Sequence, residues 1–192
     1  MRAALLLVVA TVAAGCGYGF GGGAPTVPHA ARSVAITRFV NHTREKGLDV
    51  SLQRAVEDEF RRRGPLTVVR DPEGDVVVSG SIRRFTSIPV AFGASDNAVQ
   101  YIGSLVVRVR LRDRRSGKVL YENTSLEETL DFGATPGVVV SSSPSFQQET
   151  INARDLIDMT NVQIGEARRR EALSSLVDRI ARDVYLQTME GF

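Results

Sequence analysis

The chain has 192 residues, a formal net charge of +2, 43% hydrophobic and 24% charged residues, and one cysteine. These values are ordinary for a globular domain, and the near-balance of charge differs from the strongly basic composition of domains that bind nucleic acid. One cysteine permits no internal disulfide. The sequence has two histidines, with no second Cys and no paired acidic ligand near them, whereas a metal site needs three or four converging ligands. We therefore expect a domain that binds no metal, cofactor or nucleic acid.

The first residues have the pattern of an exported protein. Arg2 precedes an apolar run from Ala3 to Ala14, which is too short to cross a bilayer, where about 20 residues are needed. A short apolar segment before small residues is typical of a cleaved secretory signal. Ala13-Ala14-Gly15-Cys16 resembles the bacterial lipobox, in which the cysteine is diacylated and becomes the first residue of the mature chain, although Ala13 stands where Leu is usual. The alternative is an ordinary signal that happens to contain a cysteine.

The composition predicts three segments. We expect a lipoprotein signal peptide over residues 1–15, a lipid anchor with a flexible tether over residues 16–32, and a single domain over residues 33–192. The tether is rich in Gly and Pro, and such sequence behaves as random coil that sets reach rather than structure.

The first half of the domain alternates strand and helix patterns. Ser33 to Val40 is β-branched and predicts a strand. Lys46 to Arg63 predicts a helix that ends at Gly64-Pro65, because its apolar residues are spaced by four. Short strands are expected over Leu66 to Arg70 and over Asp75 to Phe85.

Within the last of these strands, Gly80 indicates a bulge or a close approach of another part of the chain. Thr86 to Ala98 contains Pro89 and several small residues, which predicts a loop.

Val99 to Arg112 shows the clearest alternation in the chain and predicts a strand with two distinct faces. A hairpin loop over Asp113 to Lys118 leads to a partner strand over Val119 to Phe132. The next stretch, residues 133–150, is long for a connection inside a compact domain, so we expect it to be functional or mobile.

The C-terminal part predicts an amphipathic helix. Ile151 to Ile164 is an earlier helical piece, and Gly165 is a plausible break between the two. The helix over Lys46 to Arg63 and the C-terminal helix are expected to pack their apolar faces on the central strand, Val99 to Arg112. The residues expected in that core are Leu52, Val56, Phe60, Leu173, Leu176, Ile180, Leu105, Val107 and Val109.

No catalytic motif is present in the sequence. It lacks a Gly-x-Ser-x-Gly elbow, a His-Glu-x-x-His helix, a phosphate-binding Walker loop and a dinucleotide fingerprint. We therefore expect a protein that is not an enzyme.

The candidate ligand-binding residues are arginines. Arg108, Arg110 and Arg112 recur at period two on one strand face, and Arg83 and Arg84 would lie beside them if the two strands pair. Arginine binds phosphate through two parallel hydrogen bonds, so this set suits a phosphorylated ligand. Two alternatives stay open. The arginines form a solvated face of the sheet, or they pair with acidic residues of the neighbouring strand, namely Glu122, Glu127 or Glu128.

Several short motifs in a fixed order carry a family resemblance. They are Gly15-Cys16-Gly17-Tyr18, a strand at Val34-Ala35-Ile36, Phe39-x-Asn41-x-Thr43, a Leu48/Leu52 helix, Leu66-x-Val68-Val69, Asp75-x-Val77-x-x-Gly80-x-Ile82, an arginine-rich strand, a Gly117-Lys118-Val119-Leu120 hairpin and an amphipathic C-terminal helix. Together they resemble the lipopolysaccharide-assembly lipoprotein family, LptE.

The resemblance implies an α+β fold, a two-layer sandwich with a mainly antiparallel or mixed sheet of about four strands packed on two helices. It implies a non-enzymatic lipoprotein of the outer membrane that plugs the LptD β-barrel, faces the periplasm and helps move lipopolysaccharide to the outer leaflet. Gly17 fits this location, because an Asp after the cysteine is the inner-membrane retention signal of enteric bacteria. The ligand it implies is lipopolysaccharide phosphate.

Val34 to Val69 also looks like the opening of periplasmic lipoproteins of the CsgG/LpoB type, which are secretion-pore subunits or activators of cell-wall synthases. In those proteins further helices follow the strands. Residues 75–132 instead predict strand after strand without a helix between them, and element order sets fold class. The LptE interpretation is therefore favoured.

Overall fold

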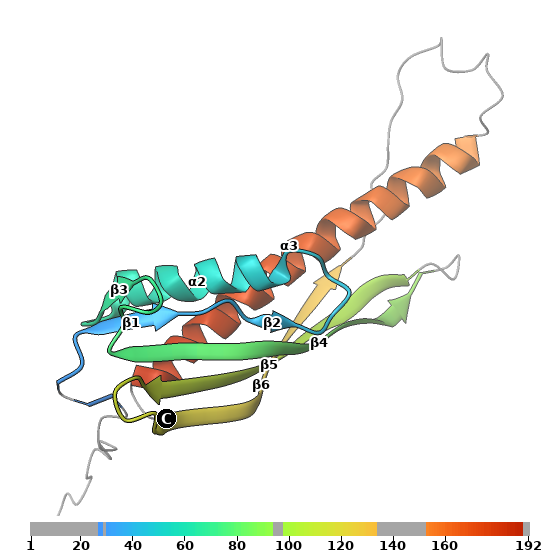
Figure 1. Ribbon diagram of the computed structural model, residues 1–192. Coiled ribbons are helices and arrows are strands. Elements are labelled where there is room, and N and C mark those ends of the chain that lie inside the picture. Colours follow the sequence, from blue (N-terminus) through green and yellow to red (C-terminus); the bar gives the residue numbers. More distant parts are fainter. Residues whose placement is uncertain (1–26, 29, 94–97, 134–152, 190–192) are drawn as a thin grey trace, which may run out of the picture.

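The computed structural model describes residues 27, 28, 30–93, 98–133 and 153–189, with side chains described from residue 165 onward in the last range. Its elements, labelled as in Figure 1, are β1 (Ser33–Ile36), β2 (Val40–Asn41), α2 (Leu48–Arg63), β3 (Thr67–Val69), β4 (Val76–Phe92), β5 (Ala98–Asp113), β6 (Val119–Gly133) and α3 (Ala153–Met189). The expected signal peptide, Cys16, nearly all of the tether and most of the predicted 133–150 loop lie outside the described residues.

The strands form one mixed sheet in the order β3-β1-β4-β5-β6, with β2 paired to β4. β1 runs parallel to both β3 and β4, whereas β4, β5 and β6 are successive antiparallel neighbours. The α+β, two-layer architecture is therefore confirmed. The sheet has six strands rather than about four, because the short β2 and β3 join the four other strands.

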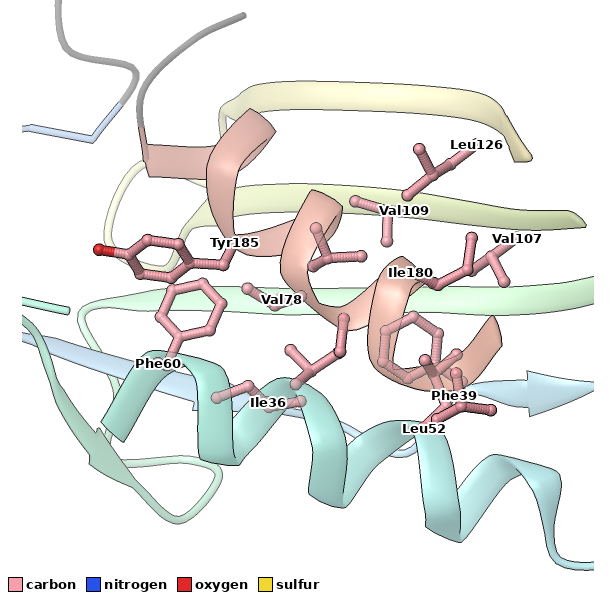
Figure 2. Close-up of a cluster of buried hydrophobic side chains, with 14 of the residues drawn as sticks. Ile36, Phe39, Leu52, Phe60, Val78, Val107, Val109, Leu126, Ile180 and Tyr185 are labelled. Atoms are coloured by element: carbon pink, nitrogen blue, oxygen red, sulfur yellow. The ribbon is translucent and has the colours of Figure 1, made fainter. Parts of the chain in front are cut away.

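Both helices pack on one face of the sheet, and the core lies between them and the strands (Figure 2). The alternation of β5 is confirmed, since Leu105, Val107, Val109 and Leu111 are fully buried. All nine core residues expected from the sequence belong to the core, Leu173 at its margin: Leu52, Val56, Phe60, Leu173, Leu176, Ile180, Leu105, Val107 and Val109.

An aromatic contact joins the ends of the two helices. The ring of Phe60 in α2 meets the ring of Tyr185 in α3 edge to face, with centroids 5.2 Å apart and planes at 78° (Figure 2). The Tyr185 hydroxyl donates a hydrogen bond to the carbonyl of Arg63 at 3.1 Å. This contact holds the end of α2 against α3.

β4 extends further than the sequence predicts. The expected loop over Thr86 to Ala98 is wrong up to Phe92, because the strand continues through Pro89 and pairs it with Tyr101. β2 leaves β4 at Ile82, so the outer side of β4 is an edge from there on among the described residues. Proline is tolerated at a sheet edge because its missing N–H removes no ladder hydrogen bond there.

The two glycines singled out in the sequence have different outcomes. Gly80 marks a close approach rather than a bulge, because a Cβ there would lie 2.6 Å from the Phe39 ring. The register shift lies further along, between Ile82 and Arg84. The expected break at Gly165 is wrong, since α3 runs through it without interruption. One glycine costs a helix only about 1 kcal/mol relative to Ala, which a long helix with a packed face tolerates.

The start of β1 is fastened to the start of β4 by Asp75. Its Oδ2 accepts hydrogen bonds from the backbone N–H groups of Arg32 at 2.9 Å and Ser33 at 3.0 Å, and from the Ser33 hydroxyl at 2.8 Å. The Arg32 N–H, followed by the Ser33 hydroxyl, lowers the pKa of Asp75 below its ordinary value.

This clamp predicts an acid-sensitive contribution to stability. Because the folded-state pKa of Asp75 is lower than the unfolded one, its contribution is present above the unfolded value of about 4 and is lost as the pH falls through the folded value. We expect Asp75→Asn to destabilise the domain at pH 7 and to lose less further stability than wild type between pH 5 and pH 3 in urea titrations. Parallel curves for the two proteins over this range would contradict the assignment.

Candidate functional site

The sheet face opposite α2 and α3, here called the open face, carries the predicted arginines. Along β5 the side chains between the buried core positions point to this face, namely those of Arg108, Arg110 and Arg112. No helix covers this face within the part of the chain that the structure describes. The predicted row is therefore on one surface, as the alternation required.

Glu122 of β6 holds two of these arginines. Arg108 donates from Nε to Glu122 Oε1 at 2.9 Å and makes a second bond from Nη2 to the same oxygen, and Arg110 donates from Nη2 at 3.0 Å. The Arg108 hydrogen bond, then that of Arg110, lowers the pKa of Glu122. One carboxylate thus neutralises part of the charge of two guanidinium groups and fixes their orientation.

The other predicted arginines make no such pairs. Arg112 lies opposite Val77, and Arg84 lies opposite Val106, so both stand on the open face. Arg83 is in the register shift beside Arg84, and both are exposed. Among the described residues, none of these three side chains forms an ion pair or hydrogen bond. The structure therefore brings Arg84 close to the row, with Arg83 beside it.

The three acidic residues considered as partners have different roles. Glu122 pairs with the arginines, whereas Glu127 accepts a hydrogen bond from the Ser104 hydroxyl at 2.6 Å. Glu128 lies on the helix side, where burial, then a hydrogen bond with Asp183, raises its pKa. Of these three residues, only Glu122 therefore occupies the arginines that a ligand would need.

A second polar feature lies between the helices and was missed by the sequence analysis. A groove of about 610 Å³ runs between α2 and α3 and is lined by charges of both signs. Arg169 of α3 pairs there with Glu45 and lies 5.1 Å from the centre of the Phe85 ring. Because this cation is already engaged by the protein, the groove is a weaker candidate than the open face. No periodic pattern in the sequence reveals such a contact between distant segments.

The described residues contain no cluster of three or more His, Cys, Asp or Glu side chains that could hold a metal ion. None of the helices in those ranges is long and apolar enough to cross a membrane.

The chain thus has a two-layer α+β fold whose open sheet face carries the row of arginines. The model of the family described as "LptE: Lipopolysaccharide-assembly" matches residues 31–188. The chain belongs to the LptE family. It is therefore an envelope-associated lipoprotein with a role in lipopolysaccharide assembly, in a family whose members are not catalysts.

Several solved structures are similar to this chain at low identity. The PelC dodecamer of Paraburkholderia phytofirmans is 15% identical, with a TM-score of 0.48 over 82% of this chain and 88% of that one. The rare lipoprotein B of Shewanella oneidensis is 14% identical, with a TM-score of 0.45 over 80% and 94%. Lipoprotein B of Nitrosomonas europaea is 14% identical, with a TM-score of 0.45 over 82% and 84%. The comparison with curated proteins gives no significant match.

Proposed function

We propose that this chain is an outer-membrane lipoprotein, anchored on the periplasmic side through acylated Cys16, that partners an LptD-like β-barrel. It assists lipopolysaccharide assembly by binding rather than by catalysis. Membership of the LptE family supports this role, and the Ala14-Gly15-Cys16 sequence with Gly17 after it supports the anchor and the membrane. The family match also favours this function over that of a CsgG/LpoB-type lipoprotein.

The observation that carries the binding role is the excess of arginine on the open face. Arg108 and Arg110 share one carboxylate, and Arg84 and Arg112 stand on the same face without partners among the described residues. Guanidinium groups bind phosphate through charge-assisted hydrogen bonds. We propose that this face, with Arg83 at its margin, contacts the phosphates of lipopolysaccharide.

The anchor predicts a defined mature N-terminus. Mass spectrometry of the protein from its native membrane should find Cys16 as the first residue, carrying two or three acyl chains. A single chain gives only marginal membrane binding, so more than one is expected for a stable anchor. A mature chain that begins elsewhere, with an unmodified thiol, would overturn this assignment.

The arginine row predicts a loss of lipopolysaccharide binding. The triple variant Arg108→Glu, Arg110→Glu, Arg112→Glu should bind at least about a hundredfold more weakly, because each charge-assisted hydrogen bond contributes about 1.5 kcal/mol or more. Replacement of the three by Lys should be only partly defective, since the charge remains and the planar fork is lost. Binding is measured by titration with purified lipopolysaccharide, and melting curves report the fold.

The control is a variant with the same change of charge elsewhere, Arg44→Glu, Arg54→Glu, Arg70→Glu, which should bind normally. Because three new carboxylates beside Glu122 repel one another, a triple Arg→Gln variant guards against misfolding. The opposite effect is expected for Glu122→Gln, which frees Arg108 and Arg110 and should tighten binding. Equal binding by all these proteins would show that the row is only a solvated face.

Co-purification with a large β-barrel from solubilised outer membrane tests the partner independently.

A further inference from the structure

A groove between α2 and the edge strand β3 has no part in the proposed function. β3 is the outermost strand of the sheet, and α2 lies beside it (Figure 1). The groove has a volume of about 700 Å³. Its walls are the carboxyl ends of β1 and β3, the residues that follow these strands, and a stripe of α2 formed by Gln53, Glu57 and Arg61. It therefore borders a sheet edge that is free among the described residues.

The backbone of β3 offers hydrogen-bonding groups to this groove. The Thr67 N–H donates to the carbonyl of Arg32, just before β1, at 2.9 Å. Successive residues of a strand direct their N–H and C=O groups to opposite sides, so those of Val68 point away from β1. Within the described ranges β3 pairs only with β1, so Val68 has no strand on its outer side. Free backbone groups of this kind match the backbone of one more extended strand.

The α2 side of the groove is a fixed polar wall. Gln53 Nε2 donates to Glu57 Oε1 at 2.9 Å and to the Ile36 carbonyl at 3.4 Å. Arg61 is shared between Glu57 and Asp58, so it is not available to a ligand. These acidic residues lie toward the end of α2, which leads into the start of β3 and so lies away from the carboxyl ends of the strands.

Positive charge is left over at the carboxyl ends of β1 and β3. Arg38 follows β1, Arg70 follows β3, and both line the groove. The side chain of Arg70 makes no ion pair or hydrogen bond with any described residue. Arg38 is 69% exposed and has one contact, to Asp49 at 3.8 Å. The acidic residue after Arg70, Asp71, is already paired with Arg114. This end of the groove therefore suits a carboxylate.

The direction of the strands relates the free edge to the arginines. A strand added beside β3 and parallel to it brings its own carboxyl end to Arg38 and Arg70. We propose that the groove binds the C-terminal segment of another protein as an additional parallel strand, which pairs with the backbone of Val68 and places its terminal carboxylate between the two arginines. Backbone pairing supplies affinity, and the carboxylate fixes direction and register. The site is at the opposite edge of the sheet from β6 and is separate from the arginine row.

The probe is a fluorescein-labelled hexapeptide of alternating Thr and Val with a free C-terminal carboxylate. Its binding to the full chain is measured by fluorescence polarisation. We expect the free acid to bind at least roughly tenfold more tightly than the same peptide with a C-terminal amide, the scale of one charge-assisted hydrogen bond. The variant Arg38→Glu, Arg70→Glu should lose this difference and bind the free acid at least roughly tenfold more weakly. The matched control, Arg44→Glu, Arg54→Glu, changes charge outside the groove and should bind like wild type.

A second set of peptides tests the backbone pairing without altering the protein. Only every second N–H of an added strand faces β3, so N-methylation of one alternate set should abolish binding and N-methylation of the other set should not. No binding of the free acid, equal binding of acid and amide, or equal effects of the two methylation patterns would each overturn the proposal. Dimers that the Arg38→Glu, Arg70→Glu change dissociates in sedimentation runs, together with no peptide binding, would also overturn it and assign the groove to a second copy of the chain.

Discussion

Phe60→Ala should lower the free energy of unfolding by about 3–5 kcal/mol, the range for truncation of a buried Phe. Phe60 has no exposed surface and contacts Tyr185 across the helix pair. The loss combines the transfer of the ring to water with the cavity left between α2 and α3. Urea unfolding followed by circular dichroism measures it.

The matched control is the same substitution at an exposed ring. Phe92 is 60% exposed, so Phe92→Ala should change the stability by no more than about 0.5 kcal/mol, the scale of surface substitutions. A loss below about 1 kcal/mol for Phe60→Ala would show that the helix pair is not packed as described.

Gly80→Ala should also lower the free energy of unfolding strongly, by about 3 kcal/mol or more. Overpacking a core usually costs about 1–3 kcal/mol, and the cost is higher where the surroundings cannot relax. A methyl group there would meet the Phe39 ring and also the backbone carbonyl of Arg108 on the neighbouring strand. The ring can move, but the carbonyl belongs to the sheet ladder and cannot move without opening it.

Gly165→Ala provides the control of opposite sign. Nothing lies within 4 Å of a Cβ at Gly165, so the substitution should stabilise α3 by up to about 1 kcal/mol. Adding Phe39→Leu to Gly80→Ala should recover only part of the loss, since it removes the ring contact and leaves the carbonyl. Thermal melts of the four proteins compare these effects, and a Gly80→Ala variant as stable as wild type would contradict the packing.

Periodicity predicted much of this fold because the apolar faces are regular. The spacing of four in α2 and the alternation in β5 placed Leu52, Val56, Val107 and Val109 correctly in the core. These patterns survive in the sequence because each face meets a single environment, either core or solvent.

The errors arose where an element depends on a distant partner. Pro89 suggested a loop. Its place within a strand becomes clear only from the structure, where β2 stops pairing with β4 at Ile82 and leaves Pro89 at a sheet edge that tolerates proline. Gly80 allowed two interpretations until Phe39, far away in the sequence, was placed against it. Local pattern contains no information on such neighbours.

The candidate site was predictable in part. The shared face of Arg108, Arg110 and Arg112 follows from period two alone. Period two does not tell which of Glu122, Glu127 and Glu128 pairs with the arginines. Two register shifts, between Val107 and Val109 and between Leu111 and Arg112, decide which β6 residue lies opposite each arginine. Those shifts place Glu122 beside Arg110 and leave Arg112 opposite Val119.

The Asp75 clamp also has a mechanical consequence. Tension that reaches the domain through the residues before Val27 acts on the buried Val27 side chain and then on the beginning of β1. That strand is held on both sides, by β3 and by β4, and Asp75 fastens its first residue. Tension directed along the strand loads all of these hydrogen bonds together in shear rather than breaking them one at a time. Under the membrane anchor proposed above, tension at the N-terminal end therefore loads this contact before it reaches β5, which carries the arginine row.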